Sequence, residues 1–173
     1  ARRVMFIIGR VMGFVQPVSG KTGVLLTLDV NMNHDLTDDA PFEVPQVDSA
    51  RKGIVMKLAR SYSLPAPHTE WLPYRIAYEK SDRPDGTISE DLFVVPNYRF
   101  EGAFRLGAKD YSVSLYDGDL GGRFVREKQV NVSLTITPKE SLGKPGAGSS
   151  HRLFELIPIG GSLYEIKAIA EDG

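Results

Sequence analysis

Residues 24–40 read VLLTLDVNMNHDLTDDA, an apolar run that passes directly into the densest cluster of oxygen-bearing side chains in the chain. The first part, Val24 to Leu28, has the Val, Leu and Thr content that is typical of a strand. In the second part acidic and amide residues fall at alternate positions, namely Asp29, Asn31, Asn33 and Asp35. With this spacing the first residues of a calcium-binding loop point their side chains at one ion. The stretch therefore predicts a strand that ends in an acidic loop.

The same alternation of strand and turn continues along most of the chain. Short apolar or alternating runs are separated by segments that contain Pro, Gly or Asp. The expected strands are 4–8, 11–15, 23–28, 54–59, 72–79, 91–95, 98–106, 111–116, 129–137, 152–157 and 163–170. The pattern predicts an all-β chain, an antiparallel β-sandwich or partly closed barrel of about ten short strands with at most one short helix. Residues 1–173 are long enough for a single domain of this kind.

Residues 48–60 fit either a helix capped by Asp48 or Ser49, or a strand, and Gly53 together with the alternation that follows favours a strand over 54–59. The sequence Asp-Arg-Pro-Asp-Gly at 82–86 predicts a turn between two strands, because Pro fixes φ and Gly accepts a positive φ. Gly pairs or single glycines at 107 and 160–161, each followed by a strand, predict two further hairpins.

The composition excludes several classes of protein. The 21 basic and 22 acidic residues give a net charge of -1, so no electrostatic signature of nucleic-acid binding is present. No cysteine is present, which excludes disulfides and thiolate metal sites. No apolar stretch has the length of a membrane span, and the apolar part of residues 2–8 is too short for a signal peptide. A protein or a glycan is the expected partner, and the oligomeric state is not indicated.

The acidic loop can be read in two ways. Compared with a complete EF-hand loop, the first three ligand positions are filled, but His34 replaces the usual Gly and Ala40 replaces the final Glu. The candidate calcium ligands are Asp29, Asn31, Asn33 and Asp35, with Asp38 or Asp39 assisting. The alternative is an ion-free turn held by side-chain hydrogen bonds to the backbone. In that case replacement of Asp29 by Ala is expected to cost little.

Other motifs carry less weight. Ser19 to Thr22 resembles the end of a phosphate-binding P-loop, but its first Gly is misplaced and no helical pattern follows. The three histidines, His34, His68 and His151, have no second ligand at metal-binding spacing. Trp71, close to His68, is expected to pack onto the core, with a pocket as the alternative. No nucleophile motif indicates catalytic residues, although carboxylates from different strands can form a pair that no sequence spacing reveals.

Two stretches together resemble a pattern in bacterial secreted β-rich domains, which occur alone or ahead of thioredoxin-like domains. They are residues 28–40 and residues 106–124, the latter reading LGAKDYSVSLYDGDLGGRF. Asp29, Asn31, Asn33 and Asp35 match the first part of the pattern, and Asp117, Asp119, Gly122, Arg123 and Phe124 match the second. The chain departs from the pattern at His34 and Gly121. The resemblance implies an extracytoplasmic (periplasmic or secreted) β-sandwich accessory domain with calcium-like loops.

These observations leave three hypotheses for the function. The first is a non-enzymatic, extracytoplasmic binding or accessory module whose acidic loop, Asp29, Asn31, Asn33, Asp35 and Asp39, binds calcium or stiffens the fold without it. The second is a hydrolase of glycan or ester substrates that uses carboxylates from different strands. The third is a structural subunit of an assembly, which an exposed apolar patch or a swapped N-terminal strand would favour.

Overall fold

The computed structural model describes residues 3–8, 11–20, 22–62, 67–118, 132–167 and 169. Strands dominate these residues, and their only helices are two 3₁₀ turns of three residues each, which confirms the all-β prediction. The strands form antiparallel-rich sheets, and none of those seen in the described ranges closes into a barrel. No helix in this part of the chain is long and apolar enough to cross a membrane.

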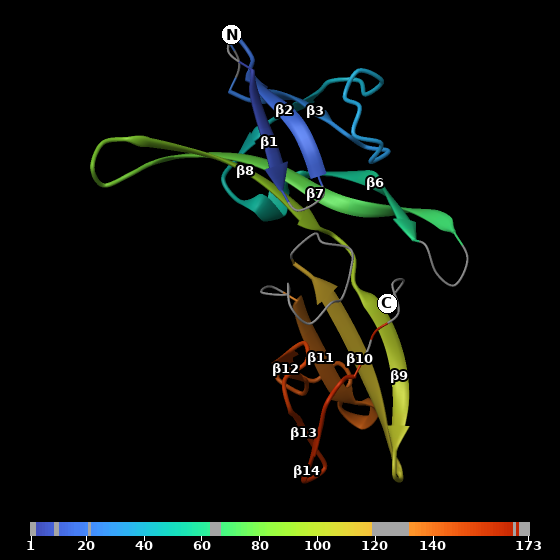
Figure 1. The fold of residues 1–173 in the computed structure, drawn as a ribbon. Coiled ribbons are helices and arrows are strands. Elements are labelled where there is room, and N and C mark those ends of the chain that lie inside the picture. Colours follow the sequence, from blue (N-terminus) through green and yellow to red (C-terminus); the bar gives the residue numbers. More distant parts are fainter. Residues whose placement is uncertain are drawn as a thin grey trace. The chain divides into compact units, whose positions relative to one another are not determined.

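The described residues divide into two compact units (Figure 1). Unit 1 contains the residues up to 61 and residues 67–97, and unit 2 contains residue 62 and the residues from 98 onward. The prediction of one domain over residues 1–173 is not tested by this division and stays a prediction.

Unit 1 contains two four-stranded sheets. The strands of the first, in spatial order, are β1 (Val4–Ile8), β2 (Val11–Pro17), β3 (Val24–Leu28) and β4 (Phe42–Val44). In β3 the burial alternates, so that Val24, Leu26 and Leu28 are buried while the residues between them are partly exposed. This period of two is the pattern of a strand with one face on a core. The other face of β1 exposes Met5 and Ile7.

The second sheet of unit 1 is built around one long strand, β7 (His68–Asp82). It pairs with β5 (Gln46–Val47), β6 (Ile54–Tyr62) and β8 (Ile88–Pro96), and the 3₁₀ turn η1 (Ala50–Lys52) lies between β5 and β6. The strand expected over 54–59 is therefore confirmed. Of the alternative, a helix within residues 48–60, only the three-residue turn η1 is present. Figure 1 shows β7 and β8 side by side as a long hairpin. Its turn contains Gly86 at φ 80°, as the Pro-Asp-Gly sequence predicts.

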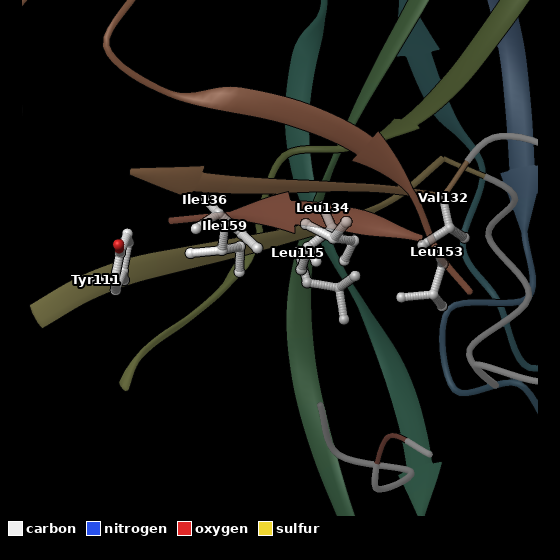
Figure 2. Close-up of a cluster of buried hydrophobic side chains, with 8 residues drawn as sticks. Tyr111, Leu115, Val132, Leu134, Ile136, Leu153 and Ile159 are labelled. Atoms are coloured by element: carbon white, nitrogen blue, oxygen red, sulfur yellow. The ribbon is translucent and has the colours of Figure 1, made fainter. Parts of the chain in front are cut away.

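Unit 2 combines a four-stranded sheet with a short hairpin. The sheet has the spatial order β12 (Ser149–Arg152), β11 (Val132–Pro138), β10 (Lys109–Asp117) and β9 (Phe100–Leu106), and the hairpin joins β13 (Ile157–Ile159) to β14 (Ser162–Tyr164). The second 3₁₀ turn, η2 (Lys139–Ser141), follows β11. Figure 2 shows Leu115, Leu134 and Ile159 gathered with other apolar side chains in one buried cluster. The hairpins expected at residues 107 and 160–161 are both present.

Two expected strands near the C-terminal end are wrong. A single strand was expected over 152–157, but β12 ends at Arg152 and a turn follows, in which Phe154 adopts a φ of 66°. A second was expected over 163–170, but β14 ends at Tyr164. The hydrophobicity of these residues serves packing instead, because Leu153, Phe154 and Ile166 all contact the core of unit 2. Of the strand expected over 129–137, residues 129–131 lie outside the described residues.

Candidate functional site: the acidic loop

The acidic loop, residues 29–40, begins where β3 ends. Asp29 is fully buried, and its backbone N–H donates to the carbonyl oxygen of Met12 at 3.0 Å. Its two carboxylate oxygens accept hydrogen bonds from the backbone N–H groups of Asn33 at 3.0 Å and His34 at 2.9 Å. A buried carboxylate needs such donors, because an unpaired charge away from water costs several kcal/mol. Asp29 therefore fixes the start of the loop.

The next turns of the loop are held by side chains that accept from the backbone two residues further on. The Oδ1 atom of Asn31 accepts from Asn33 N at 3.1 Å, and the Oδ1 atom of Asn33 accepts from Asp35 N at 2.7 Å. Asp35 Oδ1 accepts from the N–H and the hydroxyl of Thr37 at 2.9 and 2.7 Å. These bonds lower the pKa of Asp35, the bond from the Thr37 hydroxyl contributing most. The alternate spacing in the sequence thus corresponds to consecutive Asx turns.

His34 occupies the position at which a calcium loop normally has Gly. The structure holds it at φ 66°, in the left-handed region that Gly adopts most readily. Its backbone N–H is the one that donates to the buried Asp29. His34 therefore adopts the positive φ that Gly usually supplies at this position, and the hydrogen bond to Asp29 offsets part of the conformational cost.

The side chains of Asp38 and Asp39 accept hydrogen bonds from the first residues of the loop. Asp38 Oδ2 accepts from the side-chain amides of Asn31 at 2.9 Å and Asn33 at 3.0 Å. Asp39 is buried, with 9% of its surface exposed, and its Oδ1 accepts from the backbone N–H of Val30 at 3.2 Å. Its Oδ2 is buried and has no hydrogen-bond partner. Burial raises the pKa of Asp39, and the negative charges of Asp38, Asp29 and Asp35 raise it further.

The structure thus brings all five predicted metal ligands, Asp29, Asn31, Asn33, Asp35 and Asp39, into one loop. Across the described residues, no group of three or more Asp, Glu or His side chains is arranged to hold a metal ion. A calcium site here would need the amide oxygens of Asn31 and Asn33 and backbone carbonyl groups as well as carboxylates. The hydrogen bonds described above are those of the ion-free turn, so calcium binding stays a prediction.

The other candidates lie elsewhere. Asp117 is buried at the end of β10, while Asp119, Gly122, Arg123 and Phe124 fall outside the described residues. Ser19, Gly20 and Thr22 lie between β2 and β3 with a strand and not a helix following, so this stretch is not a P-loop.

The expectation for Trp71 is wrong, because 51% of its surface is exposed. The reason is that the first four residues of β7, 68–71, all lie outside the core and are exposed.

Sequence reasoning also missed a polar hollow in unit 1, to which Tyr78, Lys80 and Asp82 contribute. These three residues alternate along one strand, and the hairpin turn places Glu90 opposite Lys80 on the same face. This alternation is the sequence signal from which the hollow could have been predicted. Comparisons with models of protein families, with curated proteins and with solved structures found no match to this chain.

Proposed function

We propose that the chain is a non-enzymatic, extracytoplasmic binding or accessory module whose acidic loop binds calcium. The observation that carries this proposal is Asp39 Oδ2, a buried carboxylate oxygen without a hydrogen-bond donor, close to three other carboxylates. Such an atom costs about 1–3 kcal/mol when it stays unsatisfied. A divalent cation offsets this cost and the repulsion between carboxylates, and calcium prefers an oxygen set of this kind.

The proposal predicts that calcium stabilises the wild type but not the variant Asp39→Asn. In excess chelator at neutral pH the variant is expected to be more stable by about 1 kcal/mol, because it removes a buried charge and its amide can donate to neighbouring carboxylates. Millimolar calcium is expected to raise the melting temperature of the wild type by several degrees and to leave that of Asp39→Asn unchanged. Thermal melts with and without calcium measure both effects.

The dependence on pH follows from the raised pKa of Asp39. When folding raises the pKa of a carboxyl, the folded state disfavours its ionisation. The free energy of unfolding therefore falls as the pH rises from the ordinary pKa of the group, about 3.9, through the raised value. In chelator the advantage of Asp39→Asn is therefore expected at neutral pH and absent below the ordinary pKa.

Asp85→Asn is the matched control for these melts. Asp85 accepts from Thr87 in the β7–β8 turn as Asp35 accepts from Thr37, and it lies outside the acidic loop. It should keep the full calcium response. A wild type without any response to calcium, measured beside a stabilised Asp39→Asn, would mean that the loop is an ion-free turn.

A second candidate function, a subunit of a homomeric assembly, is favoured by the outer face of the first sheet of unit 1. Met5 and Ile7 on the edge strand β1 are 56% and 63% exposed. They pair with Phe14 and Met12 of β2, so the four side chains share one face. Exposed apolar edge strands invite pairing with a second copy of the chain.

The assembly candidate predicts that Ile7→Lys weakens self-association by at least about thirty-fold, since burial of one Ile contributes about 2 kcal/mol. Sedimentation over a range of concentrations measures this change. Ile88→Lys is the control, because Ile88 is similarly exposed, at 54%, on a different sheet. A wild type that stays monomeric at every concentration would contradict the candidate.

A further inference from the structure

A polar hollow of about 450 Å³ lies in unit 1, where β5, β7 and β8 meet the segment between β2 and β3. Its polar lining side chains are Thr22, Gln46, Tyr78, Lys80, Asp82 and Glu90. The volume is in the range of small-molecule sites. The hollow contains none of the residues of the acidic loop, so it is a separate feature of the molecule.

The register of the β7–β8 hairpin places the charged side chains of the hollow. Lys80 pairs across the strands with Glu90, and the Lys80 Nζ atom lies 3.0 Å from Glu90 Oε1. Tyr78 and Asp82, two positions away on either side of Lys80, share its face of the strand. The lysine of the hollow is thus already neutralised, and the carboxylate of Asp82 remains as an acceptor.

Tyr78 contributes a buried aromatic side chain with a hydroxyl group to the lining of the hollow. Only 7% of its surface is exposed. Burial raises the pKa of Tyr78, and the charge of Glu90 and a hydrogen bond to Glu90 raise it further, so the hydroxyl stays protonated, donates to Glu90 and can accept from a ligand. Thr22 and Gln46 also carry groups of both kinds. The lining therefore offers donors and acceptors side by side with little net charge.

Two further hollows share lining residues with this one, and the three together are called the groove. One, of about 580 Å³, shares Thr22 and Gly23 with it, and the other, of about 360 Å³, shares Gln46 and Lys80. In the latter the charges are again paired, with Lys52 Nζ 2.7 Å from Asp48 Oδ2. A groove of several linked hollows suits a ligand made of repeating units.

We propose that this groove binds a neutral oligosaccharide. Sugar hydroxyls donate and accept hydrogen bonds at once, as the groups of the lining do. Phosphate and other anionic ligands are disfavoured, because each lysine of the two hollows that carry one is held by a carboxylate. An apolar ligand would leave the carboxylate, amide and hydroxyl groups of the central hollow desolvated and unpaired. The inference rests on the proposed binding role of the chain, but not on calcium.

Saturation-transfer NMR with named neutral hexasaccharides tests the proposal. The probes are cellohexaose, xylohexaose, maltohexaose, mannohexaose and chitohexaose, each at millimolar concentration. At least one is expected to give a signal that weakens as the chain is shortened to the disaccharide, because shorter chains fill fewer of the linked hollows. Asp82→Asn replaces a charged acceptor by a neutral amide, and Gln46→Ala removes a donor and an acceptor, so each is expected to weaken that binding at least about ten-fold.

Asp85→Asn, in the same hairpin but outside the lining, should bind as the wild type does. Absence of a signal from all five probes would overturn the proposal. So would a signal that Asp82→Asn and Gln46→Ala leave unchanged, since the sugar would then bind elsewhere. The calcium melts described above separate the two proposals, because Asp82→Asn should keep the calcium response of the wild type whether or not a sugar binds.

Discussion

Replacement of Asp29 by Ala is expected to lower the free energy of unfolding by about 3 kcal/mol in chelator, because it removes two hydrogen bonds to a buried charge. Asp29 has no exposed surface, and its carboxylate accepts from Asn33 N and His34 N. The variant would leave the N–H of His34 without this acceptor at the point where the loop adopts a positive φ. The small cost expected from the sequence for an ion-free turn therefore no longer holds. Urea unfolding followed by circular dichroism measures the loss.

Asp35→Ala is the control for this prediction. Asp35 belongs to the same loop and also accepts two hydrogen bonds, but it is exposed and its partners can turn to water. Its replacement is therefore expected to cost only a small fraction of what replacement of Asp29 costs. Equal losses from both variants would contradict the view that burial of the Asp29 carboxylate holds the loop.

Gly53→Ala is expected to destabilise unit 1 by about 3 kcal/mol, at the upper end of the cost of over-packing a core. A Cβ atom at this position would clash with the carbonyl oxygen of Ile76 and lie 2.8 Å from Ala77 Cβ. The first contact is with backbone, which cannot rotate away as a flexible side chain does. The junction between η1 and β6 would have to move off β7. A fall in the urea midpoint with an unchanged slope would show this loss.

Gly102→Ala is a matched substitution in unit 2. A Cβ atom there would meet only Val113 Cγ1, at 3.3 Å, which needs a shift of a few tenths of an ångström in one side chain. The expected change is within about 0.5 kcal/mol. If Gly53→Ala destabilised the protein as little as this control does, the close approach of residue 53 to β7 would not explain the glycine at this position.

The parts of the fold that follow from local chemistry could be predicted from the sequence. The alternation in Val24 to Leu28 fixes a strand with one buried face, and Pro84 and Gly86 fix the turn of the β7–β8 hairpin. The strands expected near the C-terminal end are wrong because isolated apolar residues such as Phe154 pack onto the core from turns. A hydrophobic residue indicates burial, whereas only a regular period indicates the element that carries it.

The candidate site could be predicted only as a set of residues. The spacing of Asp29, Asn31 and Asn33 predicts Asx turns or calcium ligands equally well, since both use the same oxygens. The burial of Asp39, which distinguishes it from its neighbour Asp38, depends on tertiary packing. The polar hollow depends on the parallel pairing of Gln46 with Tyr78, a contact between distant parts of the sequence. Such contacts leave no local pattern.

The pairing of β7 with three other strands also affects the order in which unit 1 is expected to fold. Its pairing with β8 closes over a short turn, whereas its parallel pairing with β5 joins segments far apart in the chain. A contact that closes a short loop costs less conformational entropy than a contact between residues far apart in the sequence, and it forms sooner. We therefore expect the hairpin to form first in unit 1 and β5 to dock onto it late. Changes in the turn around Gly86 would then slow folding, whereas changes in β5 would mainly speed unfolding.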